Sequence, residues 1–205
     1  MIQYKGVDVL DIRPDGGPGR QESQVRLVDI LDPVTAPAVN EARSPVAAWS
    51  GTVTISCETR AQTKAVRDFL DRRLGRLVPF WLPSMVADLT LASDVLNAAS
   101  SLTIKAVGYS STLFPPSLAR RYLALYGADF LPDCYKVTAA SPGSGTETLS
   151  ITPGAARAYS APATVLSFLR YCRLDEDFAE FRWENPLGPC EIAFRAVEIP
   201  NEVPS

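Results

Sequence analysis

The clearest pattern of apolar and polar positions in this chain lies in residues 51–84. It begins with strict alternation, in which one side carries Val53, Ile55 and Cys57 and the other carries threonine and serine. A period of two with β-branched residues predicts a half-buried strand. Cys57 is therefore expected to be a small buried hydrophobic residue of that strand.

A period of three and four residues replaces the alternation after residue 59. The apolar positions predict the buried face of an amphipathic helix, and they are Val66, Phe69, Leu70 and Leu74. The opposite face is charged and consists of Lys64, Arg67, Asp68, Asp71 and Arg72. We expect Thr59 to cap the helix N-terminus, and Gly75 to end the helix in a left-handed conformation.

Further strands are predicted on both sides of this helix and at the C-terminal end of the chain. The apolar run 77–82 is stopped by Pro83, so the central unit is predicted to be strand, helix, strand. Residues 178–183 and 190–199 predict a terminal β-hairpin. Its alternation matches that of the first strand, and we expect it at an edge of the first sheet.

The middle of the chain has the pattern of a small β module. Short strands are separated by turn residues at intervals of about 8–12, which is typical of a sandwich or barrel. They are residues 101–107, 121–126, 135–139 and 147–151. We therefore predict a mainly β protein with one principal α-helix (α+β). A discontinuous, β-sandwich-like, ring-forming domain (1–85 plus 166–205) would carry an inserted small β-barrel or sandwich module (86–165), because surface loops tolerate insertions.

The segment that precedes the central unit is less regular. Residues 24–31 predict a strand of uncertain facing, and 32–46 are rich in proline and alanine without a period. Such a segment cannot bury much apolar surface by itself. We interpret it as an extended connection or an arm, and its length for a loop makes it a candidate for contact with another subunit.

Composition excludes several classes of function. The 205 residues carry a net charge of −3 with both signs interspersed, which argues against a nucleic-acid-binding protein. Histidine is absent, which removes the commonest general base and most zinc sites. No apolar run approaches the roughly 18 residues of a membrane helix. We expect no membrane span, no cofactor and no metal.

The cysteines indicate the compartment of synthesis. Four are present, widely spaced and without a CxxC pair: Cys57, Cys134, Cys172 and Cys190. The first ten residues have no apolar signal segment, so a secreted disulfide framework is not expected. We expect intracellular synthesis with reduced thiols, and leave open which cysteines lie close together.

Three patterns could carry chemistry, and each has a simpler structural interpretation. Asp175-Glu176-Asp177 is acidic enough for a metal, but adjacent residues of an extended chain point in alternating directions, which favours a solvated turn. Gly143-Ser144-Gly145 lacks the flanks of a nucleophile elbow or phosphate loop and predicts a turn. Ser101 and Lys105 show no sign of a catalytic dyad. We therefore predict no catalytic residues and a protein that is not an enzyme.

Aromatic and basic pairs are the other candidates. Phe80-Trp81 and Phe181-Trp183 could form a stacking surface or an interface, but we favour packing of at least two of the four in the core. The basic residues are too few for a phosphate site and are expected to be exposed charges or partners for acids on a neighbouring subunit. They are Arg72, Arg73, Arg76, Arg120 and Arg121.

Residues 72–84, with the sequence RRLGRLVPFWLPS, resemble tail-tip proteins of long-tailed, siphovirus-like bacteriophages. In that group a helix that ends in glycine leads into an FWLP-type strand, followed by a D-L-T-L piece (88–91 here) and a small inserted β domain that begins near Leu102. The chain end is also similar, in RLDED at 173–177 and VEIP at 197–200. The resemblance covers about residues 51–200, whereas the first fifty residues carry little that matches.

The resemblance implies a structural virion protein, the distal tail protein of the tail tip or baseplate. Such a protein forms an oligomeric, usually hexameric, ring and connects the tail tube protein to the baseplate hub or tail-tip protein, with the tape measure protein as a further candidate partner. Its location would be the virion, after synthesis in the host cytoplasm. Two alternatives stay open. One is a glycan- or receptor-binding module that uses Tyr109, Tyr122, Tyr126 and Tyr135 of the insertion as stacking faces. The other is a tail-associated peptidase or hydrolase.

Overall fold

The computed structural model of the chain describes residues 2–11, 22–25, 28–31, 39–42, 48–114, 120–129, 131–183 and 189–204. In chain order the strands are β1 (Gln3–Tyr4), β2 (Val7–Asp8), β3 (Glu22–Val25), β4 (Val28–Leu31), β5 (Val39–Ala42), β6 (Ala48–Cys57), β7 (Phe80–Pro83), β8 (Ser101–Lys105), β9 (Tyr122–Tyr126), β10 (Pro132–Pro142), β11 (Thr146–Thr152), β12 (Val165–Leu174), β13 (Glu180–Trp183) and β14 (Cys190–Glu198). The helical elements are α1 (Arg60–Asp71), the π-helical turn η1 (Tyr109–Leu113) and the 3₁₀ turns η2 (Ala161–Ala163) and η3 (Pro200–Glu202).

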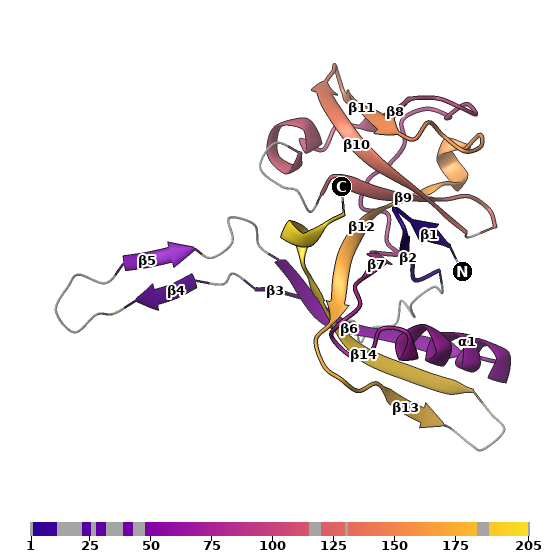
Figure 1. The fold of residues 1–205 in the computed structure, drawn as a ribbon. Helices are drawn as coiled ribbons and strands as arrows, with labels where there is room; N and C mark the ends of the chain where they lie inside the picture. Colours follow the sequence, from indigo (N-terminus) through magenta and orange to yellow (C-terminus); the bar gives the residue numbers. More distant parts are fainter. Residues whose placement is uncertain are drawn as a thin grey trace.

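One large antiparallel sheet organises the molecule (Figure 1). Its strand order is β3-β6-β14-β12-β9-β10-β11-β8, with β13 paired to β14 and β7 paired to β12 off this path. The prediction of a mainly β protein is confirmed. The sheet is not closed into a barrel, because β3 and β8 remain as its two ends.

Strand β12 belongs to both halves of this sheet. Its first residues pair with β9, from Val165 opposite Tyr126 to Phe168 opposite Leu123. Its last residues pair with β14, and β7 lies along the middle of the strand. The predicted boundary at 165/166 therefore falls at the start of a strand that hydrogen-bonds to both parts, and the two-domain division stays a prediction.

The buried apolar side chains form three clusters. The first lies between α1 and the β6–β14 part of the sheet and contains Val66, Phe69 and Phe80. The second is built only from residues 89–168. The third joins the N-terminal strands to β7, β9 and β12 around Trp81. Strand β9 separates the last two, because Leu123 and Leu125 face one cluster while the tyrosines of the same strand face the other.

The central unit confirms the predicted strand and helix start. Val53, Ile55 and Cys57 are buried on one side of β6. Thr59 caps α1 in a full capping box, in which its Oγ1 accepts from the Gln62 N–H while the Gln62 side chain accepts from the Thr59 N–H.

The helix C-terminus corrects the prediction. The helix ends at Asp71, and both Leu74 and Gly75 have positive φ, of 49° and 64°. Leu74 therefore does not continue the apolar stripe and is 65% exposed. Gly75 is left-handed as expected, but it lies in the loop that follows the helix. The next strand begins at Phe80, so Leu77 is an exposed loop residue.

The terminal hairpin joins the first sheet beside β6 as expected, and its outer strand β13 pairs only with β14 among the described strands. Strands β13 and β14 pair with each other, and β14 also pairs with β6 from Cys190 opposite Cys57 to Val197 opposite Ser50. Because β14 has partners on both sides, it lies inside the sheet and not at its edge. Its alternate residues Ile192, Phe194 and Ala196 are buried in the first cluster, which accounts for the central position.

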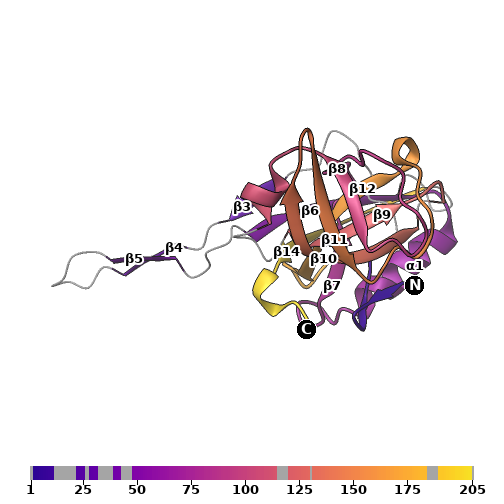
Figure 2. The same ribbon diagram turned by 90° about the horizontal axis from the view of Figure 1, so that it is seen from above.

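The remaining strands broadly follow the predicted positions. The turn at 143–145 joins β10 to β11, where the Gly143 N–H donates to the Thr146 carbonyl at 2.8 Å. Segment 24–31 contains parts of β3 and β4, and the predicted arm 32–46 contains β5. Residues 32–38 and 43–46 lie outside the described residues. Strands β4 and β5 form a two-stranded ribbon that extends away from the rest of the chain (Figures 1 and 2).

Candidate functional site

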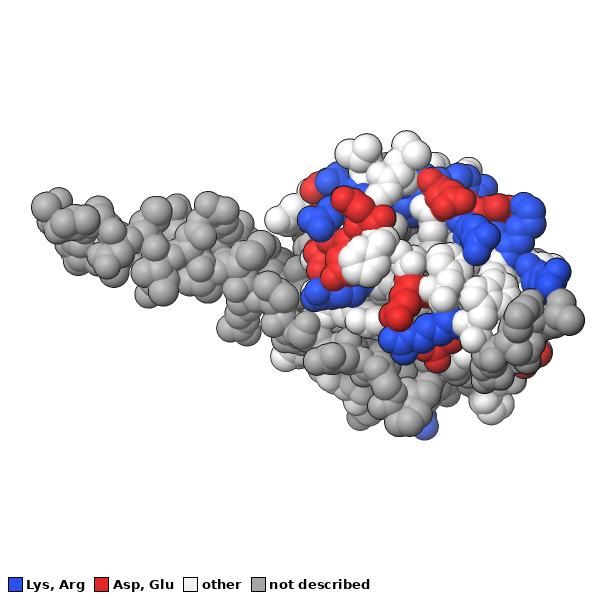
Figure 3. All heavy atoms as spheres, turned by 90° about the horizontal axis from the view of Figure 1, so that it is seen from below, with Lys and Arg blue, Asp and Glu red and all other residues white. Residues whose placement is uncertain are grey.

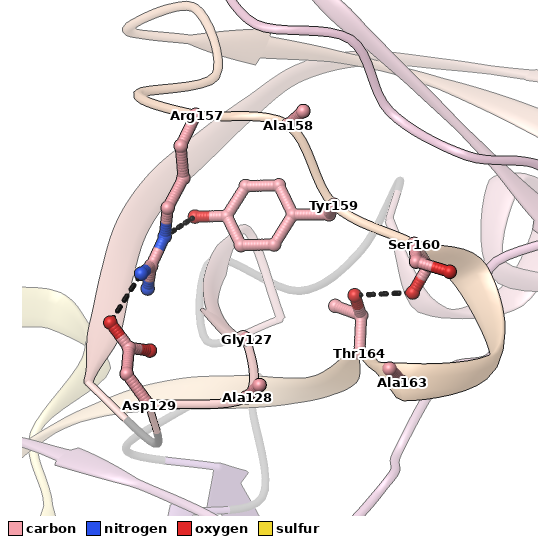
Figure 4. A pocket seen from close by; sticks show the side chains of 9 residues that line it. All are labelled: Gly127, Ala128, Asp129, Arg157, Ala158, Tyr159, Ser160, Ala163 and Thr164. Carbon is pink, nitrogen blue, oxygen red and sulfur yellow. Dashed lines mark hydrogen bonds and ion pairs between the residues drawn. The ribbon is translucent and has the colours of Figure 1, made fainter.

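A recess of about 340 Å³ opens between the turn after β9 and the segment that leads into β12. Residues 127–129 form one wall, and residues 157–160 with 163 and 164 form the other (Figure 4). Most of the side chains that line it are small, and Tyr159, whose ring lies behind them, is only 3% exposed. A ligand in the recess would therefore meet backbone, small side chains and the Arg157–Asp129 ion pair, and would not stack on an aromatic face.

The charged side chains of this recess form ion pairs with one another. Arg157 pairs through Nη1 with Asp129 and through Nε with Asp133 at 2.7 Å. Its Nη2 donates to the Leu131 carbonyl at 3.0 Å. The hydrogen bond from Arg157 lowers the pKa of Asp129. These contacts hold the 157–164 segment against the turn between β9 and β10.

A chain of hydroxyl groups continues this network inward. The Tyr159 hydroxyl donates to Asp133, and the Tyr135 hydroxyl lies 3.2 Å from that of Tyr159. The Ala156 N–H donates to Tyr135 at 3.0 Å. Burial, followed by the hydrogen bond to Asp133, raises the pKa of Tyr159, so this phenol stays protonated as a donor. We interpret the whole arrangement as a brace within the fold.

The structure separates the four aromatic anchors. Phe80 and Trp81 are both fully buried, in the first and third clusters. The Trp81 Nε1–H donates to the Tyr4 carbonyl at 3.0 Å, which ties the N-terminal strands to β7. Phe181 is partly buried against the first cluster, whereas Trp183 is 42% exposed. The expectation that at least two anchors pack in the core is confirmed.

The tyrosines proposed as glycan-stacking faces do not reach solvent. Tyr109, Tyr122, Tyr126 and Tyr135 are all at most 6% exposed. Tyr109 and Tyr135 lie in the second cluster and the other two lie in the third. Alternate residues of β9 pack in different clusters, so both faces of this strand are buried.

The basic residues are less exposed than expected. Arg72 and Arg76 are exposed, but Arg73 is 2% exposed and pairs with Asp8. Its Nε donates to the Phe69 carbonyl at 3.2 Å and its Nη1 to the Pro79 carbonyl at 3.0 Å. Arg120 and Arg121 are half-buried over the rings of Phe168 and Phe114.

The side chains of the acidic turn at 175–177 form ion pairs with arginines. Asp175 and Glu176 pair with Arg195 at 3.6 and 3.1 Å, and Asp177 pairs with Arg76 at 3.7 Å. Within the described part of the chain, no group of three or more metal-ligating side chains converges. The three carboxylates are therefore engaged with two arginines that lie on different parts of the fold.

The four cysteines are all free thiols. Cys57 and Cys190 lie opposite each other on β6 and β14, and Cys172 belongs to the same buried cluster. Burial raises the pKa of each thiol, to about 12 for Cys134, so the thiols are protonated at neutral pH.

The carboxylate of Glu147 is buried and hydrogen-bonded, which was not predicted from the sequence. Glu147 is 3% exposed, and its two oxygens accept four backbone N–H groups, from residues 107–110 at 2.6 to 3.1 Å. A signal for it was present, because Glu147 shares its side of β11 with the buried Leu149 and Ile151. Arg73 had a similar signal, since it continues the three- and four-residue spacing of Phe69 and Leu70.

Comparison with known proteins adds no identification. The chain matches no model of a known protein family, and comparison with curated protein sequences gives no match either. In the described part of the chain, no helix is long and apolar enough to cross a membrane.

Proposed function

We propose that this chain is a structural protein of a bacteriophage tail tip, which assembles as a closed ring between the tail tube protein and the baseplate or tip proteins. The resemblance of residues 51–200 to that group is the first support. In this proposal a β-sandwich-like domain, residues 1–85 with 166–205, forms the ring and carries the 86–165 module. The expected ring contains six copies.

The observation that carries the proposal is the β4–β5 ribbon. Among the described strands, β4 and β5 pair only with each other, through four residue pairs from Val28 opposite Ala42 to Leu31 opposite Val39. An isolated two-stranded ribbon is at best marginally stable in water. A ribbon that extends away from its own body (Figure 2) therefore calls for a second surface to cover it, and another copy of the chain can supply that surface.

Closed rotational symmetry fits the rest of the fold. The sheet ends at β3 and β8. Residues 90–92 hydrogen-bond to the outer side of β8, whereas β6 is the one partner of β3 among the described strands. Sheet edges require either cover or a device against open-ended pairing. Identical chains that use two different surfaces for contact form a ring when the rotation closes and a filament when it does not.

Electron microscopy and mass photometry of the purified chain, alone and with the tail tube protein of the same phage, test the proposal. We expect closed rings of one copy number. A chain that stays monomeric at high concentration and forms no ring with the tube protein contradicts it.

A further inference from the structure

Cys57 and Cys190 form a cross-strand pair at one end of the β6–β14 ladder. Cys57 is the last residue of β6 and Cys190 is the first residue of β14, and the two lie directly opposite each other. Both are free thiols and both are 1% exposed. They belong to the first cluster, so their side chains lie on the same face of the sheet.

The backbone hydrogen bonds define the separation of this pair. The Asp175 N–H donates to the Arg195 carbonyl at 2.9 Å, so the odd-numbered residues of β14 turn their backbone groups away from β6. The register of β14 against β6 is continuous from Cys190 to Val197, and Cys190 therefore turns its backbone groups toward Cys57. In a hydrogen-bonded pair of this kind the Cα atoms lie about 5.5 Å apart. That separation is within the range of about 4.4–6.8 Å found in disulfides.

The two side chains need only a small movement to form a bond. Directly opposite Cβ atoms lie about 4.5–5.5 Å apart and a disulfide brings them to about 3.5–4.5 Å, so closure requires about 1 Å. In the described part of the chain, no residue after Cys57 pairs with β14, and the ladder is free to adjust at this end. Trp183, which lies opposite Cys190 on the outer strand β13, is 42% exposed. Local opening of this corner admits a reagent to both sulfur atoms.

Helix α1 places one group beside each thiol that favours its ionised form. Burial raises the pKa of Cys57, and the Thr63 hydroxyl opposes this shift. Burial likewise raises the pKa of Cys190, and the positive charge of Arg67 opposes it. The thiolate is the reactive form of cysteine, so these two groups increase the reactivity of the pair.

The other two cysteines lack both features. Cys134 lies opposite Ala124, and Cys172 lies opposite Glu198. Burial raises the pKa of both thiols, and the carboxylates of Asp133 and Glu198 raise it further. These two thiols therefore provide an internal control in the same chain.

We propose that Cys57 and Cys190 are a modification site, at which a small-molecule disulfide of the glutathione class closes a cross-strand disulfide between β6 and β14. One protein thiolate attacks a sulfur of glutathione disulfide, which forms a mixed disulfide and releases one glutathione. The second protein thiolate attacks the protein sulfur of that mixed disulfide and releases the other glutathione. Two protein thiols are oxidised to one disulfide, glutathione disulfide is reduced to two glutathione molecules, and the two thiol protons pass to these products.

The charge of the surface is compatible with this oxidant. Seen from below, acidic and basic side chains are interspersed over the described surface (Figure 3). Glutathione disulfide, which is anionic, therefore meets no large field of like charge on this face.

The new bond closes a loop that contains most of the chain, including the whole second cluster. A cross-link over a long loop stabilises a fold chiefly by reducing the entropy of the unfolded chain. The pair stays reduced in a reducing cytoplasm and is cross-linked when the protein reaches an oxidising environment. This inference is independent of the ring function proposed above.

The test uses the purified full-length chain in its reduced form. The chain is incubated with glutathione disulfide under native conditions, the remaining thiols are alkylated after unfolding, and intact mass and peptide maps are recorded. We expect the loss of two hydrogen atoms and one cross-linked pair of peptides that contains Cys57 and Cys190, with Cys134 and Cys172 recovered in alkylated form. The melting temperature of the oxidised chain is expected to rise by roughly 5 to 15 °C.

Single variants separate the pair from a general effect of oxidation. Cys57→Ala and Cys190→Ala each leave one thiol, which can gain glutathione but cannot close the cross-link, so oxidation is expected to leave their melting temperatures unchanged. The matched controls Cys134→Ala and Cys172→Ala keep the pair and are expected to cross-link as the wild type does. Between pH 7 and pH 8 the rate should rise about tenfold, because both thiols of the pair are protonated over this range.

Glutathione redox buffers measure whether the fold favours the bond. The chain that lacks both Cys134 and Cys172 is compared in its native state and in urea. We expect the equilibrium constant for closing the disulfide to be roughly 100-fold or more larger in the native chain, because the fold places the two sulfur atoms together.

Two results would overturn the inference. One is a native wild-type chain that keeps its thiols or only gains glutathione. The other is an equilibrium constant in the native chain that does not exceed the value in urea, because the fold then opposes the bond. Neither result bears on the ring proposal, which electron microscopy and mass photometry test separately.

Discussion

Glu147 and Glu198 are both almost fully buried, yet their surroundings shift the carboxyl pKa in opposite directions. Burial opposes ionisation of both. In Glu147 four backbone N–H groups outweigh burial and lower the pKa to about 2. Within the described part of the chain, Glu198 accepts from one backbone N–H, that of Trp49 at 3.1 Å, and burial prevails and raises its pKa even with Arg120 and Arg170 nearby. The number of hydrogen-bond donors to the ionised carboxylate therefore decides whether its pKa is lowered or raised.

Glu147→Gln is expected to destabilise the fold by about 2 kcal/mol at neutral pH, because charge-assisted hydrogen bonds are replaced by weaker ones. The contribution of Glu147 is fully present above the unfolded pKa of 4.5 and is lost as the pH falls through the folded value of about 2. Urea unfolding of the wild type and the variant at pH 7 and pH 3 measures this. A difference that does not shrink on acidification contradicts the assignment.

Glu198→Gln is expected to keep or increase stability at pH 7, in contrast to the change at Glu147. A raised folded pKa means that the contribution of Glu198 is most favourable below the unfolded pKa and is lost as the pH rises through the folded value. The amide oxygen can still accept from Trp49 without a buried charge. Unfolding curves at pH 4 and pH 7 should show the advantage of the variant growing with pH, and a large loss of stability at pH 7 would refute this.

At the scale of the element, α1 depends on its capping box. Thr59→Ala removes the acceptor for the Gln62 N–H and is expected to cost about 1 kcal/mol of unfolding free energy. Thr59→Ser keeps the hydroxyl and serves as the matched control, with an expected change of only a few tenths. Thermal and urea unfolding distinguish the two. Equal losses in both variants would show that the methyl group, and not the cap, matters.

At the scale of the whole molecule, β12 joins both halves of the sheet, so the halves are expected to unfold together. Leu149→Ala in the second cluster should cost about 2 to 5 kcal/mol. It should also reduce the protection of amides in α1, which belongs to the first cluster. Hydrogen exchange of the wild type, this variant and the exposed control Val107→Ala tests the coupling. Unchanged protection of α1 would instead support independent folding of the 86–165 module.

The sequence alone determined the elements whose pattern is local. The alternation of β6, the Thr59 cap of α1 and the turn between β10 and β11 depend on neighbouring residues, so spacing and turn residues were sufficient to predict them. The mainly β class followed from the same patterns, and so did the expectation that at least two of the four aromatic anchors are buried.

Only the tertiary structure decided what each face of an element meets. The tyrosines of β9 were candidates for an exposed stacking surface, but they pack in the third cluster. Arg73 was expected to be an exposed charge, but it is buried and bonded to Asp8 and two backbone carbonyls. The position of β14 inside the sheet and the exposure of Leu74 likewise depend on strands and loops distant in sequence. Periodicity records that a side is buried or exposed, whereas the identity of its partner is set by long-range packing, which no local pattern contains.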